Sequence, residues 1–471
     1  MAINGVAGAG AGDVDVDVDV DASAPPPPLH LVMFPWLAFG HLIPFLQLAK
    51  RLAARGHAAV TFLATPRNAS RLAALPPELA AYVELLKKAF DGLAAPFAAF
   101  LADACAAGDR EGRPDPFSRR PDWVVVDFAH GWLPPIADEH RVPCAFFSIY
   151  SAAALAFLGP KAAHDAHPRT EPEDFMSPPP WITFPSTIAF RRHEAAWVAA
   201  AAYRPNASGV SDIDRMWQLH QRCHLIVYRS CPDVEGAQLC GLLDELYHKP
   251  VVPAGLLLPP DAAGDDDDGH RPDLMRWLDE QPARSVVYVA LGTEAPVTAD
   301  NVRELALGLE LAGARFLWAL RDAGERLPEG YKARVAGRSV VEAGWVPQVR
   351  VLAHAAVGAF LTHCGWGSTV ESLRFGGLPL VMLPFIADQG LIARAMADRG
   401  LGVEVARDDD GDGSFRGEDV AAAVRRVMAE EEGKVFARNA REMQEALGDG
   451  ERQDRYVDEL AERLRRRRSL S

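Results

Sequence analysis

Residues 345–389 read WVPQVRVLAHAAVGAFLTHCGWGSTVESLRFGGLPLVMLPFIADQ and are the most informative part of the chain. Within them, Ala359–Thr362 is a short apolar run, typical of a buried parallel strand. A turn with two glycines follows, then residues 366–376 with helical spacing, then a second apolar run at Leu380–Leu383. Because parallel strands that alternate with helices bind ligands at their carboxyl ends, we expect a binding site where these runs end.

The same alternation extends outward over most of the chain. Short apolar runs typical of strands recur at residues 31–34, 59–63, 123–127, 144–148, 225–228, 286–289, 316–319 and 340–342. Residues 160–215 show little periodicity, and we expect loops and short helices there. The predicted fold class is therefore α/β, with two domains of similar size, each built on a Rossmann-like parallel sheet, facing each other across a cleft.

Two breaks in the alternation suggest domain boundaries. The aspartate–valine repeat at 13–21 and the four prolines that follow cannot build a core. Prolines and the run Asp265–Asp268 make residues 256–272 a predicted linker or exposed loop. We therefore expect four parts: a disordered N-terminal tail at 1–28, a first domain at 29–248, a second domain at 249–448 and a C-terminal helix at 449–471.

Composition excludes several classes of function. The formal net charge is −15 and the pI is near 5.4, so the chain should repel both nucleic acid and anionic membrane surfaces. No apolar run reaches the ~18 residues typical of a membrane span. The six cysteines form no CxxC motif and no Cys/His cluster with metal-ligand spacing. They are predicted to be free thiols in a reducing compartment, which we take to be the cytoplasm.

The turn after residue 362 has the chemistry of a phosphate site. His363 supplies an imidazole, Gly365 and Gly367 let the backbone approach a ligand, and Ser368 is a good cap for the helix. An ordinary tight turn between a strand and a helix uses the same glycines. The residues by themselves therefore leave both interpretations open.

Further candidates lie at other strand ends. Trp345 is either a stacking platform for a base or part of the core. Asp388 and Gln389 suit sugar hydroxyls, or they cap a helix. His41 follows the first strand and is either a cap, a surface group or a catalytic base, and Asp127 ends another strand.

Taken together, residues 345–389 resemble the signature box of plant UDP-sugar glycosyltransferases of secondary metabolism. WxPQ, LxHxxVGxFxTHCGWxSTxES and the closing DQ are all present and in order. Pro35–His41 and Tyr288–Gly292 are most similar to the group that extends sugars on terpenoid and flavonoid glycosides. The resemblance implies the GT-B architecture, with an acceptor-binding first domain and a UDP-sugar-binding second domain.

The resemblance also implies a role for each matching residue. His41 would be the catalytic base, oriented by Asp127. Trp345 would stack on uracil, Gln348 and Glu371 would hold the ribose, and His363 and Ser368 would contact the diphosphate. The full predicted UDP-sugar-binding set is Thr293, Trp345, Val346, Gln348, His363, Gly365, Trp366, Gly367, Ser368, Glu371, Asp388 and Gln389.

The resemblance further implies the reaction. The expected activity is inverting transfer of glucose from UDP-glucose to a small hydrophobic acceptor, a terpenoid or flavonoid glycoside, by a monomer that needs no metal or other cofactor. Gln389 and Trp366 favour glucose, while UDP-rhamnose and UDP-xylose stay open. Aromatic candidates for the acceptor side are Phe39, Phe128, Trp132, Phe147 and Tyr150.

Three departures from the family pattern are visible. Gly367 stands where the family usually has a polar residue, and one residue is added around Gly376–Leu378. About thirty residues are missing between Leu75 and Phe90. These departures keep a catalytically impaired, sugar-nucleotide-binding relative as the alternative. A nicotinamide-dependent oxidoreductase is disfavoured, because Leu29–Lys50 holds a single glycine where a glycine-rich loop is required.

Overall fold

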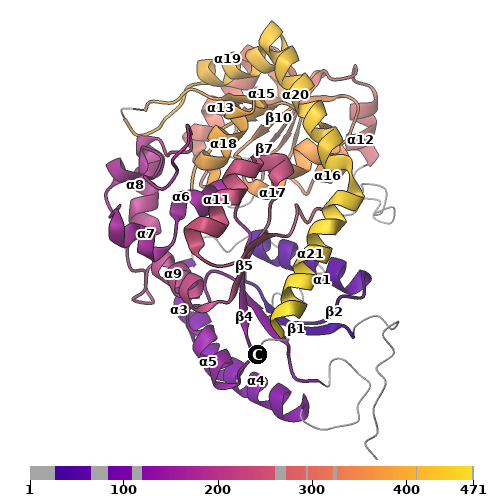
Figure 1. The fold of residues 1–471 in the computed structure, drawn as a ribbon. Coiled ribbons are helices and arrows are strands. Elements are labelled where there is room, and N and C mark those ends of the chain that lie inside the picture. Colours follow the sequence, from indigo (N-terminus) through magenta and orange to yellow (C-terminus); the bar gives the residue numbers. More distant parts are fainter. Residues whose placement is uncertain are drawn as a thin grey trace, which may run out of the picture.

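The structure is a computed structural model that describes residues 27–64, 83–108, 119–259, 272–292, 295–321, 326–409 and 411–468. Its framework is two parallel sheets of six strands, one in each half of the chain, with helices packed around both (Figure 1). This confirms the predicted α/β class with two Rossmann-like domains. Residues 1–26 of the predicted tail at 1–28, the acidic run at 265–268 and residues 75–82 of the shortened segment lie outside the described residues.

The first sheet has the strand order β2-β1-β3-β4-β5-β6. Its strands are β1 Leu29–Phe34, β2 Ala58–Phe62, β3 Trp123–Val126, β4 Cys144–Ser148, β5 Leu225–Tyr228 and β6 Val251–Pro253. Every residue of β1, β3 and β4 is buried, which explains their continuous apolar runs. The order reverses between β1 and β3, so the residues after these two strands meet at a topological switch point.

The second sheet has the strand order β12-β11-β10-β7-β8-β9. Its strands are β7 Val286–Ala290, β8 Arg315–Ala319, β9 Ser339–Glu342, β10 Val357–Thr362, β11 Leu380–Met382 and β12 Gly402–Glu404. Numbered within the domain, this is the dinucleotide-binding order 3-2-1-4-5-6. Its switch point lies between β7 and β10, so residues 291–292 and 363–365 are placed where such sheets bind ligands.

The helices fill the connections between strands. In the first domain they are α1 Phe39–Ala54, α3 Val83–Asp91, α4 Ala94–Gly108, α5 Leu133–Glu139, α6 Ala152–Leu158, α7 Lys161–Ala166, η3 Pro172–Phe175, α8 Arg192–Ala201, α9 Asp212–Arg222, α10 Pro232–Glu235 and α11 Ala237–Tyr247. In the second they are α12 Pro272–Asp279, α13 Ala299–Ala312, α15 Tyr331–Val335, α16 Gln348–Leu352, α17 Trp366–Glu371, η4 Ser372–Gly376, α18 Gln389–Asp398, α19 Gly417–Met428, α20 Glu431–Gly448 and α21 Gly450–Arg468. The short helices between residues 160 and 215 agree with the weak periodicity there.

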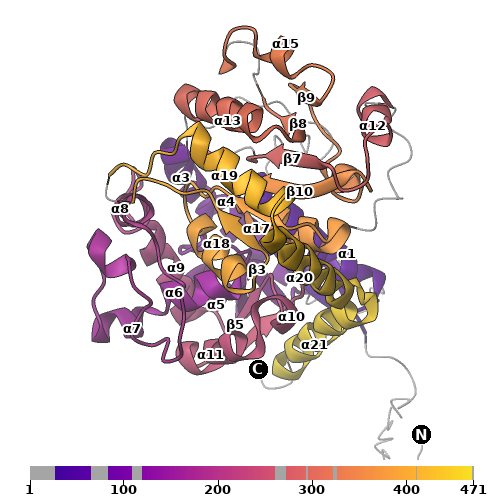
Figure 2. The same ribbon diagram turned by 90° about the horizontal axis from the view of Figure 1, so that it is seen from above.

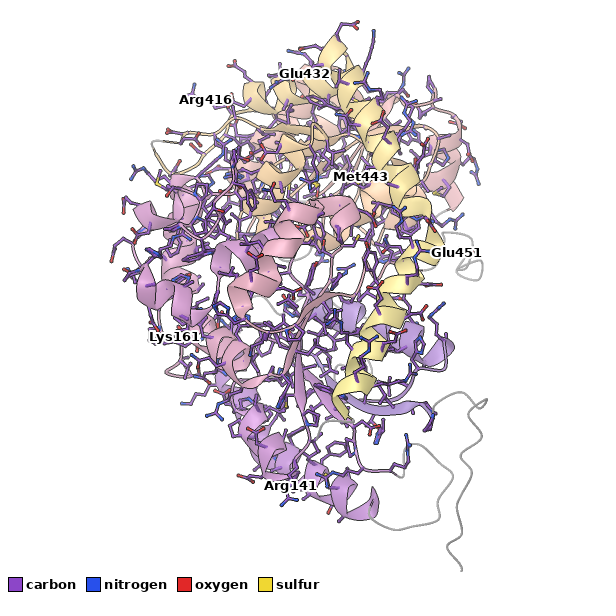
Figure 3. The ribbon with its side chains drawn as sticks, viewed as in Figure 1. Arg141, Lys161, Arg416, Glu432, Met443 and Glu451 are labelled. Atoms are coloured by element: carbon purple, nitrogen blue, oxygen red, sulfur yellow. The ribbon has the colours of Figure 1, made fainter. Side chains whose placement is uncertain are left out.

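The chain ends by crossing back to the first domain. Helix α21 leaves the second domain and lies along α1 and β6 (Figures 1 and 2). The Trp123 indole donates to the Leu464 carbonyl at 3.1 Å, and Arg55 pairs with Asp458. Arg141, Glu432 and Glu451 lie exposed on the periphery, where Figure 3 labels them. The C-terminal helix therefore ties the two domains together by packing.

The residue added around Gly376–Leu378 is accommodated at the end of a helix. Residues 372–376 form a π-helical turn that continues α17, and Gly377 follows in the left-handed region at φ 52°. A π turn holds one residue more than an α turn, so it absorbs an insertion locally. Strand β11 keeps a regular register, with Phe360 opposite Leu380 and Thr362 opposite Met382.

One stretch of the described residues meets the length and composition criteria of a membrane span. Lys87–Ala106 has a mean hydropathy of 1.3 and is an exception to our expectation that no run is long enough. It consists of two helices, since α3 ends at Asp91 and α4 begins at Ala94. Phe90, Phe97 and Leu101 from this stretch are at most 3% exposed and belong to the core, which explains its apolar character.

Candidate active site

The first group of site residues lies at the switch point of the first sheet. His41 is in the first turn of α1, which begins at Phe39. Asp127 directly follows β3. The two side chains meet across 86 positions of sequence, with His41 Nδ1 2.8 Å from Asp127 Oδ2. A carboxylate is acceptor only, so Nδ1 carries the proton and Nε2 is left with its lone pair.

Asp127 is held as a buried carboxylate. Its side chain is 1% exposed, and it accepts hydrogen bonds from the backbone amides of Trp36 at 3.0 Å and Phe128 at 2.7 Å. Burial by itself would raise the pKa of Asp127. The charge and hydrogen bond of His41, together with these amides, outweigh burial, so its pKa is lowered. The carboxylate is thus ionised at neutral pH and able to stabilise a protonated His41.

Aromatic side chains surround this pair unevenly. The Phe128 ring lies 5.3 Å from that of His41, centroid to centroid, and Trp36 packs on Phe128 at 5.6 Å. Trp132 and Tyr150 are partly buried at the edge of the same core. Phe147 is fully buried against Phe45, so the expectation that it faces an acceptor is wrong: its strand position points it into the core. The side chain of Phe39 lies outside the described residues.

The second group lies at the switch point of the second sheet. His363 directly follows β10 and is enclosed by two glycines. A Cβ atom on Gly292 would lie 2.7 Å from the imidazole, and one on Gly365 would lie 2.5 Å from it, so neither position tolerates a side chain. His363 Nδ1 is buried and has no hydrogen-bond partner in the described part of the chain. Burial lowers the pKa of His363 to about 4, so the imidazole is neutral at physiological pH.

Polar side chains gather beside the helix that starts at Trp366. The Gln348 amide donates to Glu371 Oε2 at 2.8 Å and to Ser368 Oγ at 3.1 Å. Tyr288, from β7, lies 3.4 Å from Gln348 Oε1. Burial raises the pKa of Glu371, although the Gln348 hydrogen bond opposes this. Three of the residues predicted to bind the UDP-sugar therefore form one hydrogen-bond network at the carboxyl edge of the sheet: Gln348, Ser368 and Glu371.

The two tryptophans of the signature box have different environments. Trp345 is 67% exposed, which fits a stacking platform and excludes the alternative that it is part of the core. Trp366 is 5% exposed, and its indole donates to the Arg229 carbonyl of the first domain at 2.6 Å. Trp366 thus joins the two domains, and its N–H is already used. Val346, also in the predicted set, is buried.

Asp388 and Gln389 lie at the start of α18. Gln389 is buried, and its Oε1 accepts from the backbone amides of Phe385 at 2.9 Å and Ile386 at 3.1 Å, so it shapes the loop after β11. Burial raises the pKa of Asp388 to about 6. The charge of His41, in the first domain, acts on Asp388 in the opposite direction.

Two further positions of the predicted UDP-sugar-binding set are Thr293 and Gly367. Thr293 lies outside the described residues. A Cβ atom on Gly367 would lie 3.4 Å from the guanidinium of Arg229, a first-domain residue that no sequence motif marks. Within the described ranges, no three His, Cys, Asp or Glu side chains are grouped so as to hold a metal ion. All six cysteines are free thiols.

Two Rossmann-like domains, with a His–Asp pair on one sheet edge and a glycine-enclosed phosphate-type turn on the other, define a GT-B glycosyltransferase. Residues 259–444 match the family model described as UDP-glucoronosyl and UDP-glucosyl transferase. The chain is 41% identical to UDP-glycosyltransferase 91C1 of Arabidopsis thaliana, over 94% of this chain and 98% of that one. It therefore belongs to the UDP-glycosyltransferase family of plants.

Other relatives show the range within this family. Soyasaponin III rhamnosyltransferase of Glycine max is 33% identical, over 93% of this chain and 96% of that one. Among solved structures, a Polygonum tinctorium UDP-glucosyltransferase capable of glucosylating indoxyl is 26% identical, with a TM-score of 0.74 over 94% of this chain and 100% of that one. The chain is thus an enzyme that transfers a sugar from a UDP-sugar to a small molecule.

Proposed function

We propose that this enzyme is an inverting UDP-glucosyltransferase whose acceptor is a small hydrophobic molecule that already bears a sugar, a terpenoid or flavonoid glycoside. The observation that carries the proposal is the His41–Asp127 pair, whose Nδ1 and Oδ2 atoms lie 2.8 Å apart. This arrangement brings a base to the place where the acceptor and the transferred sugar would meet.

The proposed reaction is a single displacement. His41 Nε2 takes the proton of an acceptor hydroxyl as that oxygen attacks the anomeric carbon of glucose. The bond from the anomeric carbon to the β-phosphate oxygen breaks, and UDP leaves from the opposite face, so the configuration inverts. Asp127 stabilises the imidazolium that forms. No metal takes part, because the helix N-terminus at Trp366 and neighbouring donors stabilise the leaving diphosphate.

The proposed donor is UDP-glucose. In this proposal Asp388 accepts hydrogen bonds from the sugar hydroxyls, while Gln389 fixes the loop on which Asp388 lies. The Glycine max relative is named as a rhamnosyltransferase, so UDP-rhamnose is the competing donor, together with UDP-xylose. In a mixed-donor assay UDP-glucose should outcompete UDP-galactose and UDP-glucuronate. Preference for either of those two would overturn the glucose assignment.

The proposed acceptor follows from the apolar surroundings of His41. Burial of an apolar body is worth about 25 cal/mol per Å², and a few polar groups then select the hydroxyl. Two similar solved structures contain small molecules: one is described in complex with UDP and a deoxynivalenol glucoside, and another with 3,4-dichloroaniline.

We further propose that the enzyme works as a monomer in the cytoplasm.

The deciding experiment is an acceptor screen with UDP-glucose, read by mass and by linkage analysis. Each terpenoid or flavonoid glucoside is paired with its bare aglycone. Glucose added to the existing sugar supports the proposal, and glucose added only to bare aglycones refutes the chain-extending part of it. If no acceptor reacts although UDP binds, the impaired, sugar-nucleotide-binding alternative replaces the proposal. The His41→Ala variant serves as the blank for uncatalysed transfer.

A further inference from the structure

Arg229 connects the first domain to the donor site. It directly follows β5, at the carboxyl edge of the first sheet, and it is 6% exposed. Its Nε donates to the Leu256 carbonyl at 2.9 Å, and its own carbonyl accepts from the Trp366 indole at 2.6 Å. The side chain is therefore fixed at its base by the first domain and lies against the helix that begins at Trp366 in the second.

The outer end of the side chain covers Gly367. A Cβ atom on Gly367 would lie 3.4 Å from Arg229 Nη1 and 3.9 Å from Nη2. These are ordinary van der Waals distances, so the guanidinium lies directly beside the position that a side chain at 367 would take. The family usually carries a polar group on this helix, and here the side chain that lies beside Gly367 is an arginine of the other domain.

This guanidinium is a buried cation without a bound anion. In the described part of the chain, neither Nη1 nor Nη2 has a hydrogen-bond acceptor, and no carboxylate lies within ion-pair distance. Glu371 acts on Arg229 only through space. Burial lowers the pKa of Arg229 to about 10, so it keeps its charge at neutral pH. Neither Nη1 nor Nη2 is among the fully buried atoms without a partner, so both are accessible to a ligand, and an anion there would complete the coordination of the charge.

A second unsatisfied group lies at the same helix end. His363 Nδ1 is buried without a partner, and its ring packs against Gly365, two residues before Gly367. The helical segment that starts here runs over eleven residues, from Trp366 to Gly376, and presents its free amides to the same place. Because His363 is neutral, the formal positive charge needed by a doubly charged ligand has to come from elsewhere.

We propose that Arg229 binds the diphosphate of the UDP-sugar, and that Gly367 is the residue that makes room for it. The donor site then takes a cation from the acceptor domain, so donor binding also holds the two domains together. As the glycosidic bond forms, negative charge grows on the departing β-phosphate, and a charge-assisted hydrogen bond from Arg229 stabilises it. The proposal rests on the UDP-sugar donor and is independent of which sugar or acceptor is used.

The test compares UDP with uridine, which lacks the phosphates. Isothermal titration should show that Arg229→Met weakens UDP binding by about tenfold or more, with uridine changed less than about twofold. Arg229→Lys, which keeps the charge and loses the forked geometry, should fall between wild type and Arg229→Met. Arg204→Met, which removes an exposed arginine of the same domain, is the matched control and should bind both ligands as wild type does.

A reciprocal variant separates binding from structural support. Gly367→Asn alone should weaken UDP binding, because the new side chain competes with the guanidinium for one space. In the Arg229→Met background the same change should recover at least about threefold of the lost UDP affinity, because a polar group returns to the site. Equal weakening of UDP and uridine by Arg229→Met, or no recovery in the double variant, would overturn the proposal. If the wild type binds uridine but not UDP, the donor assignment itself fails.

Discussion

The two switch points of this enzyme carry the same residue type in opposite electrostatic settings. His41, at the edge of the first sheet, is paired with the buried and ionised Asp127. His363, at the edge of the second, is enclosed by glycines, has no carboxylate partner among the described residues, and has a pKa lowered to about 4. One imidazole is equipped to gain a proton and the other to stay neutral.

The neighbours of a histidine, more than its position at a strand end, therefore decide its chemistry. A carboxylate on Nδ1 stabilises the imidazolium, so His41 suits a general base. A buried imidazole without such a partner resists protonation, so His363 suits a neutral hydrogen-bond donor to phosphate. We therefore expect substitutions at the two histidines to affect different steps, and the loss of the base to have the largest effect.

Removal of the base should have the largest effect. His41→Ala should lower kcat by about 10³-fold, because the acceptor hydroxyl loses its proton acceptor. UDP affinity, measured by titration calorimetry, should stay within about twofold of wild type. His167→Ala, at an exposed position of the same domain, is the control and should be fully active. Near-normal turnover by His41→Ala would remove His41 from the mechanism.

Removal of the charge beside the base should cost less. Asp127→Asn leaves the imidazole in place but removes the anion that stabilises its protonated form, so kcat should fall by about 10²-fold. The Michaelis constants for donor and acceptor should hardly change. A loss confined to the acceptor Michaelis constant would show that Asp127 shapes the acceptor site instead.

Removal of the second imidazole should affect binding. His363→Ala should weaken UDP by about tenfold and leave uridine unaffected, because one hydrogen bond to a charged group is lost. Because the pKa of His363 is about 4, the wild-type affinity should show no step attributable to this group between pH 6 and pH 8. If His363→Ala binds UDP normally and instead loses turnover, the proposed division between the two histidines is wrong.

The two site aspartates should respond oppositely in stability. The pKa of Asp388 is raised to about 6, so its protonated carboxyl group is the form that stabilises the fold. This contribution is lost as the pH rises through 6. Asp388→Asn should therefore raise Tm at pH 7.5 by roughly 1–3 °C, with no gain at pH 4. The lowered pKa of Asp127 gives the reverse sign, so Asp127→Asn should lower Tm at pH 7.5. Thermal scans at both pH values check this.

Chelation should have no effect. EDTA should leave transfer unchanged, because the leaving charge is met by protein groups on both domains. Loss of activity that magnesium or manganese restores would require a metal in the donor site.

Much of the donor site could be predicted because its residues are contiguous. The helix over 366–376, the strands on either side and the network around Gln348 all lie within a stretch of 45 residues. Strands β6 and β12 were not predicted, since each is short and lacks a continuous apolar run: β6 ends in a proline at the sheet edge, and β12 is Gly402–Glu404, with a single valine.

The contacts between distant segments could not be predicted from periodicity. His41 and Asp127 are 86 positions apart, and only the resemblance to a family paired them. Arg229 and Trp366 are 137 positions apart and lie on different domains, so no local pattern reveals that they meet. The choice between platform and core for Trp345 likewise depended on its exposure in the folded chain.

The configuration of the new glycosidic bond is the most direct test of His41 as the base in a single displacement. If His41 removes the acceptor proton in a single displacement, the α-linked glucose of UDP-glucose must appear as a β-glucoside, and proton NMR of the product shows this from the anomeric coupling. We expect only the β-linked product. An α-linked product would require two displacements or a different nucleophile, and would contradict the assignment of His41 as the base.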